Sequence, residues 1–192
     1  MRRLLCGAAL ALLIPVSARA EDTPKAEVFG GYSYFRFSDP TGTSLLGTDV
    51  VRLNLNGWNA SVAGNLNSWL GVVGDFSGHY GSPSILGFGV PFVDVKEHSF
   101  LGGPQISYRK DGRFTPFAHA LFGVARAGAG TFGLGASENA FAMALGGGVD
   151  LRLTNSIAVR AVQADYVQTR FLDDRQNSAR LSFGVVFRFG EK

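Results

Sequence analysis

The chain has 192 residues, a formal net charge of +3, 17% charged residues, 26 glycines and 16 phenylalanines. This length fits a single domain, and the small net charge, without a cluster of lysine and arginine, argues against a nucleic-acid partner. The single cysteine, Cys6, rules out intramolecular disulfides as the source of stability. A composition so rich in glycine and phenylalanine is unusual for a soluble secreted domain and favours a barrel.

The first twenty residues, MRRLLCGAALALLIPVSARA, have the pattern of a secretory signal peptide. Arg2 and Arg3 precede an apolar run over 4–16, and small residues occupy the positions expected before a cleavage site. We therefore predict a signal peptide at 1–20 and one barrel domain at 21–192. No later segment approaches the roughly 20 apolar residues of a membrane-spanning helix.

Period-two alternation is the dominant pattern in the rest of the chain, and it is typical of strands with two differently solvated faces. In the segment 140–153, for example, Phe141 and Leu145 share one face, and Asp150 and Arg152 share the other. Each segment is about the length needed to cross a bilayer at a tilt. The sequence thus predicts eight strands, at 26–37, 56–65, 69–80, 98–109, 114–127, 140–153, 157–169 and 178–189.

Two of these segments have faces that alternation alone does not settle. In 157–169, Ile157 and Val159 alternate with Gln163 and Asp165 only if a β-bulge intervenes. In 114–127, two rows alternate cleanly, but both are largely apolar, so the outward row is left open.

The connections alternate in length along the chain. The links 66–68, 110–113 and 154–156 are short and carry turn residues. The links 38–55, 81–97 and 128–139 are longer, and 170–177 is of intermediate length. With an even strand number and both ends of the domain on the trimmed side, this is the layout of an outer-membrane barrel with short periplasmic turns and longer external loops.

Four stretches then carry a family resemblance: GGYSY, GWNASVAGNLNSWLGVVGDFSG, TPFAHALFGVAR and VQADY. With them, the mature chain resembles the small OmpA-like and OmpX-like barrels of the bacterial outer membrane. The resemblance implies an all-β fold, namely an eight-stranded antiparallel up-and-down transmembrane β-barrel, and a location in a Gram-negative outer membrane. It implies little about function, because such proteins include adhesins, anchors, small channels and proteins of unknown role.

The last strand resembles the signal that the barrel-assembly machinery recognises in this family: a polar residue, a glycine two positions later, and aromatic residues five and seven positions later. Ser182, Gly184, Phe187 and Phe189 match these positions, although the chain continues for three residues beyond the final aromatic. The resemblance therefore implies the barrel-assembly machinery and periplasmic chaperones as partners, together with outer-membrane lipid and lipopolysaccharide. Any surface ligand stays unknown at this point.

The polar rows of the strands predict a side-chain-filled interior. An eight-stranded barrel is just wide enough for side chains to fill it, and charges buried there must pair because an isolated buried charge is very costly. We therefore expect pairs of acidic and arginine side chains rather than an aqueous pore. The predicted interior polar network is Asp75, Gln105, Arg109, Asp150, Arg152, Arg180 and Arg188, and His79 shares this face.

The opposite rows predict a lipid-facing surface with aromatic residues near the strand ends, where amphipathic rings suit the headgroup region. The predicted aromatic girdle is Tyr32, Tyr34, Trp58, Tyr80 and Tyr108. Leu181, Phe183 and Val185 continue the apolar surface on the last strand.

Catalytic and metal sites are not indicated by the sequence. Asp75, Ser77 and His79 share a strand face, but residues two apart on a strand stand about 7 Å apart, too far for hydrogen bonds among all three. His98 and Ser99 are adjacent and point to opposite faces. Three scattered histidines give no metal-ligand spacing. We expect no catalytic residue, no cofactor and no metal.

The sequence therefore predicts a non-enzymatic integral outer-membrane barrel that is structural or porin-like. A first alternative is an adhesin or ligand-binding barrel acting through the loops 38–55, 81–97 and 128–139. A second alternative is a lipid-modifying barrel enzyme that depends on His79 or Ser77. A soluble ligand-binding barrel of lipocalin type is the third.

Overall fold

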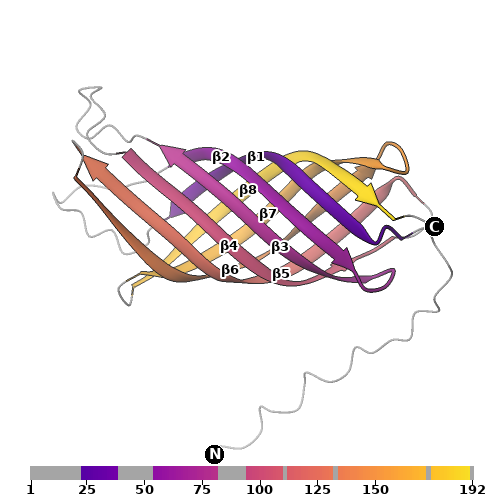
Figure 1. The fold of residues 1–192 in the computed structure, drawn as a ribbon, viewed down its shortest axis with the longest axis horizontal. Helices are drawn as coiled ribbons and strands as arrows, with labels where there is room; N and C mark the ends of the chain where they lie inside the picture. The colour runs from indigo at the N-terminus through magenta and orange to yellow at the C-terminus, as the bar shows by residue number, and fades with distance from the viewer. Residues whose placement is uncertain are drawn as a thin grey trace, which may run out of the picture.

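The chain folds into a closed barrel of eight antiparallel strands (Figure 1). The structure, a computed structural model, describes residues 23–38, 54–81, 94–109, 112–131, 134–171 and 174–190. Each strand pairs with its neighbours in chain order, and β8 pairs with β1 from Ala26↔Phe189 to Ser38↔Asn177. This closure confirms the predicted fold and satisfies both edges of the sheet. The strands are β1 (Ala26–Ser38), β2 (Asn54–Asn65), β3 (Leu70–Gly81), β4 (Asp94–Ser107), β5 (Phe114–Thr131), β6 (Leu134–Arg152), β7 (Ile157–Phe171) and β8 (Asp174–Phe189).

Tight turns gather at one end of the barrel, where β1 also begins and β8 ends (Figure 1). Between β2 and β3, Asn67 Oδ1 accepts hydrogen bonds from the backbone N–H groups of Trp69 and Leu70, at 3.0 and 2.7 Å. Between β6 and β7, Thr154 Oγ1 accepts from the N–H of Ile157 at 3.0 Å. We call this end the turn end. The opposite end, where the segments 39–53 and 82–93 connect strands, is called the loop end.

Two of the predicted loops are wrong. The segment 128–139 belongs largely to β5 and β6, which stay paired as far as Thr131↔Leu134, and 170–177 belongs largely to β7 and β8, paired as far as Phe171↔Asp174. No proline interrupts these segments, so the backbone ladder continues through their small and polar residues. The other two predicted loops, 38–55 and 81–97, fall mostly on 39–53 and 82–93, which lie outside the described residues.

A β-bulge lies in β7 between Val159 and Gln163, as predicted, and it changes which alternate residues of the strand point inward. Val149 pairs with Val162 and Asp150 with Arg160, so the register shifts by one residue at Ala161. Arg160 and Gln163 are consequently both buried, although they are three residues apart. Without this extra residue, one half of β7 would present its polar row to the outside.

Among the described residues, no helix has the length and apolar character of a membrane span. The predicted signal peptide at 1–20 lies outside the described residues, so its cleavage stays a prediction.

Candidate functional site in the barrel interior

The inward faces of the strands concentrate acidic side chains. Every carboxylate whose side chain the structure describes is buried, with at most 8% of the residue exposed. These carboxylates come from five different strands, so the barrel brings together groups that are far apart in the sequence. They are Glu27, Asp75, Glu97, Asp150 and Asp165.

Arg180 of β8 forms the central ion-pair cluster. Its Nη1 donates to Asp75 Oδ1 of β3 at 2.7 Å, and its Nε donates to Asp165 Oδ2 of β7 at 2.9 Å. Only 1% of Arg180 is exposed. Because β3 and β7 are four strands apart in an eight-stranded barrel, this side chain links opposite walls.

Three further polar side chains contact the two carboxylates. Asn59 Nδ2 donates to Asp75 Oδ2 at 2.9 Å, and Gln163 Nε2 donates to Asp165 Oδ2 at 2.8 Å. His119 Nε2 lies 2.7 Å from Asp165 Oδ1. Such additional bonds are what a buried ion pair needs to offset the loss of hydration.

Arg160 of β7 closes the interior nearer the turn end. It makes a bidentate pair with Asp150, at 2.8 and 3.0 Å. Its guanidinium lies between the rings of Phe29 and Phe117, 4.4 and 4.3 Å from their centroids. Since β1 and β5, which carry these rings, are on opposite walls, the stacked side chains fill the lumen at this level.

Glu27 is the centre of a third cluster at the turn end. Its Oε2 accepts from Arg109 Nη2 at 2.9 Å and from Asn65 Nδ2 at 3.2 Å. Arg188 Nε lies 3.4 Å from Glu27 Oε1. The cluster joins β1, β2, β8 and the segment that follows β4, and so links four parts of the barrel wall at the turn end.

A fourth cluster, towards the loop end, has the residue order of a nucleophilic triad. Ser33 Oγ lies 2.9 Å from His79 Nε2, and Glu97 Oε2 lies 2.8 Å from His79 Nδ1. Ser33 and His79 are fully buried, and Ser33 Oγ also accepts a 3.0 Å bond from Ser182. A nucleophilic serine must be reached by its substrate, and neither Ser33 nor His79 has exposed surface.

The catalytic arrangement that we considered from the sequence does not form. Although Asp75, Ser77 and His79 lie on one inward face, Asp75 bonds to Arg180, and Ser77 Oγ lies 2.6 Å from Ser99 Oγ. No group of three or more metal-binding side chains occurs within the described ranges.

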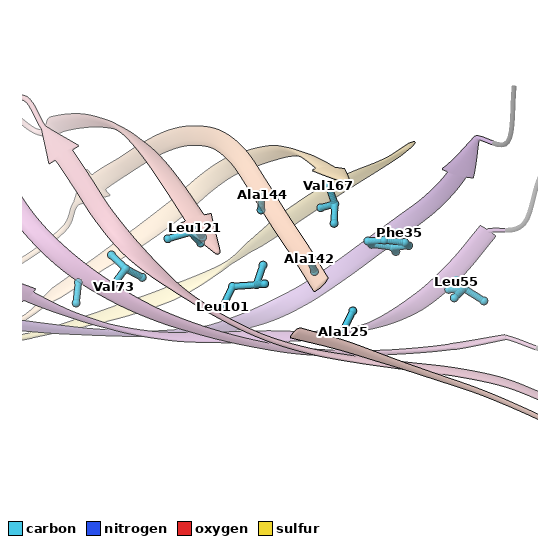
Figure 2. Packing of buried hydrophobic residues seen from close by; sticks show 10 residues of the cluster. Phe35, Leu55, Val73, Leu101, Leu121, Ala125, Ala142, Ala144 and Val167 are labelled. Atoms are coloured by element: carbon cyan, nitrogen blue, oxygen red, sulfur yellow. The ribbon is translucent and has the colours of Figure 1, made fainter. Parts of the chain in front are cut away.

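A group of ten apolar side chains is also buried inside the barrel, as Figure 2 shows. Leu55 and Leu121 of this group have no exposed surface, and Phe35 packs against the His79 ring with centroids 4.8 Å apart. On β6 the inward residues Ala140, Ala142 and Ala144 are small, which leaves room for the larger side chains opposite. The group comprises Phe35, Leu55, Ala63, Val73, Leu101, Leu121, Ala125, Ala142, Ala144 and Val167.

The structure places all but one of the predicted interior residues in the lumen. Asp75, Asp150 and Arg180 are buried and paired as described, and Arg109 and Arg188 meet at Glu27. Gln105 is buried and donates to Ser107 at 3.2 Å. Arg152 differs, because it lies at the end of β6, is half-buried and joins none of these ion pairs between described residues.

The predicted girdle residues lie on the outward face. Tyr32, Trp58, Tyr80 and Tyr108 are 42–56% exposed, and Tyr34 is half-buried on the same face of β1. In the predicted assembly signal, Ser182 points inward, and Phe187 and Phe189 point outward. Gly184 pairs with Gly31 in the closing ladder. Recognition by the assembly machinery stays a prediction.

Several interior residues were missed by sequence reasoning. Arg160 and Asp165 belong to the strand whose faces depended on the bulge, and Glu97 fell in a predicted loop. Extending the alternation of β4 back from Phe100 would have placed Glu97 inside. Glu27 has a weaker signal, because it lies only one residue after the start of its strand.

Comparisons with known proteins agree with this architecture. The family model described as outer membrane protein beta-barrel domain matches residues 6–189. Neisserial surface protein A superposes with a TM-score of 0.69 at 14% identity, over 86% of this chain and 97% of that one. The attachment invasion locus protein Ail of Yersinia pestis gives 0.59 at 19%, over 87% and 99%, and OprG of Pseudomonas aeruginosa gives 0.57 at 13%, over 88% and 98%. No curated protein matches the chain.

Proposed function

Because the chain belongs to the outer membrane β-barrel family and is an outer-membrane protein, we propose that it is a non-enzymatic structural barrel that does not conduct ions. The observation that carries this proposal is the bridging of the lumen by Arg180, which binds Asp75 and Asp165 on opposite walls. Outer-membrane barrels place their short turns in the periplasm, so the turn end faces the periplasm and the loop end faces the outside of the cell.

The lumen is bridged at four levels along the barrel axis. From the turn end, these are the Glu27 cluster, the Arg160 stack, the Arg180 cluster and the His79 cluster. An ion entering the barrel would have to separate paired charges, each of which is very costly to leave buried alone. This arrangement supports a closed structural barrel over a porin-like one.

Burial of the only serine–histidine–acid chain that we find among the described residues supports the non-enzymatic part of the proposal. Ser33 and His79 have no exposed surface, and their hydrogen bonds are satisfied by one another and by neighbours. We assign Ser33, His79 and Glu97 a packing role, in which His79 connects the walls formed by β1, β3 and β4.

Conductance across a planar lipid bilayer tests the proposal. We expect the wild-type protein to give no steady conductance, and Arg160→Ala, which removes both the ion pair and the stack between two rings, to give brief openings. Arg113→Ala, at an exposed position just before β5 at the turn end, is the matched control and should behave as wild type. A large, steady ohmic conductance of the wild-type protein would overturn the proposal and indicate a pore.

A second function, binding of a surface ligand at the loop end, is favoured by the strand lengths. β5 and β6 have 18 and 19 residues, whereas β2 and β3 have 12 each. Because each of these strands has one of its ends at the turn end, the longer β5–β6 hairpin extends farther at the loop end. Protection of 128–139 from proteases by a bound ligand would support this function, and unchanged cleavage would count against it.

A further inference from the structure

Charge is segregated between the two faces of the barrel. All carboxylates with described side chains point inward, whereas the exposed charged side chains in the described ranges are all basic. Two of these cations, Lys25 and Arg113, lie at the turn end. The other four lie on the outward face near the loop end, on β1, β4, β5 and β7: Arg36, Lys96, Arg126 and Arg170.

On β4 and β5, the cations form a compact cluster. His98 pairs directly with Arg126 across the two strands, and Lys96 lies two residues further along β4 on the same face. Directly opposed side chains have their Cβ atoms about 5 Å apart, and diagonal neighbours are about 7–8 Å apart. Three nitrogen-bearing side chains can therefore converge on a single anionic group.

Tyr80 orients the histidine of this cluster. The Tyr80 hydroxyl lies 3.1 Å from His98 Nε2, and the two rings meet edge to face with centroids 5.6 Å apart. When Nε2 accepts the hydroxyl proton, a neutral imidazole carries its own proton on Nδ1. His98 then offers an N–H donor next to the two cations.

The surface beside the cluster indicates the chemistry of the occupant. The next outward pair towards the turn end is Phe100 and Val124, each 53% exposed, and Phe122 follows at 48%. A molecule that lies against this part of the wall meets a basic group at one end and an exposed apolar strip below it. Such a surface fits an amphiphile with an anionic head and an acyl chain.

We propose that Lys96, His98 and Arg126 bind a phosphate group of an outer-leaflet lipid, whose acyl chain lies along Phe100, Val124 and Phe122. The outer-membrane location places this rim at the level of lipid headgroups. Phosphate is the anion that matches a cluster of an ammonium, a guanidinium and an N–H donor. The site does not depend on whether the barrel conducts, so conductance and lipid binding test separate statements.

The test is a lipid titration followed by native mass spectrometry. The full mature protein, refolded in non-ionic detergent, is titrated with diphosphoryl lipid A and with the same lipid lacking its phosphates. We expect the Lys96→Gln/Arg126→Gln variant to lose about 30-fold in affinity for the phosphorylated lipid, from about 1 kcal/mol for each cation near an anionic surface. The wild-type affinity should also fall as salt concentration rises.

Two matched variants separate the site from general charge effects. Lys25→Gln/Arg113→Gln removes the same charge at the turn end and should keep the wild-type affinity, and Lys96→Arg/Arg126→Lys, which exchanges the cations, should keep most of it. An equal loss in the turn-end variant, or equal binding of the lipid without phosphates, would overturn the proposal. Preferential binding of heparin would also overturn it and would point to a soluble polyanion.

Discussion

The inward and outward faces of the same strands differ in how they treat charge. On β8, Arg180 and Arg188 point inward and are ion-paired, while Leu181 and Phe183, one residue away from inward positions, are 47% and 55% exposed. The buried face is the polar one, which inverts the usual order of a water-soluble protein. Large contiguous apolar surfaces are rare on soluble monomers, so the outward face fits lipid as its solvent.

This contrast shows that the two faces are stabilised by different interactions. Inside, each charge depends on a specific partner, because removing one partner leaves the other buried and unpaired. Outside, no single apolar side chain has an obligatory partner, and depth in the membrane sets the effect of a polar replacement. Substitutions on the inward and outward faces should therefore affect stability in different ways.

The largest effect is expected at the centre of the interior. Arg180→Met should lower the free energy of unfolding by about 3–5 kcal/mol, because Asp75 and Asp165 lose their common partner while remaining buried. Urea unfolding from lipid vesicles measures this change. Arg36→Met removes the same charge from an exposed position on the outward face and should change stability by less than about 0.5 kcal/mol.

A second variant separates charge from packing at the same site. The triple change Arg180→Met/Asp75→Asn/Asp165→Asn removes the unpaired carboxylates and should recover much of the lost stability, since buried ion clusters can be replaced by uncharged groups at little net cost. If the triple variant is as unstable as Arg180→Met, packing rather than charge controls the interior.

A somewhat smaller effect is expected on the outward face, and it should depend on depth. Phe183→Arg, in the middle of β8, should destabilise the protein by about 2–4 kcal/mol, whereas Phe141→Arg, on the outward face of β6 towards the loop end, should cost about 0–1 kcal/mol. The same vesicle unfolding assay measures both. Equal costs at the two positions would contradict a lipid-facing surface with this orientation.

The smallest of the three effects concerns the closing seam between β1 and β8. A Cβ atom on Gly31 would collide with the backbone carbonyl of Phe183, whereas nothing lies within 4 Å of a Cβ on Gly30. Gly31→Ala should therefore cost about 1–3 kcal/mol, while Gly30→Ala should be neutral or slightly stabilising. A thermal melt of the refolded barrel compares them, and identical midpoints would show that the seam tolerates a side chain.

Much of the architecture followed from the sequence alone, for reasons that these residues make clear. Strict alternation, as from Leu181 to Phe189, reports both faces of a strand at once. The bulge at Ala161 was predictable because Val159 and Asp165 cannot lie on opposite faces of a regular strand. Strand ends were less predictable, since backbone pairing continues through the glycine- and alanine-rich segment 128–131.

The partners inside the barrel were not predictable in the same way. Glu27 meets Arg109, 82 residues away, only because the strands are staggered by a particular shear as the barrel closes. Apolar interior residues such as Phe29 and Phe117 were also hidden, because alternation alone does not tell an apolar side chain facing lipid from one filling the lumen. Register, rather than composition, determines these contacts.

Thiol accessibility tests most directly whether the lumen is packed with side chains. Cys6, the only cysteine, lies in the predicted signal peptide, so Ser77→Cys introduces one thiol at an interior position that is 1% exposed, and Asn54→Cys introduces one at an exposed position near the loop end. Both are treated in vesicles with a charged, water-soluble thiol reagent. We predict complete modification at position 54 and none at position 77 over the same time; rapid modification at position 77 would show a water-filled lumen and contradict the closed barrel.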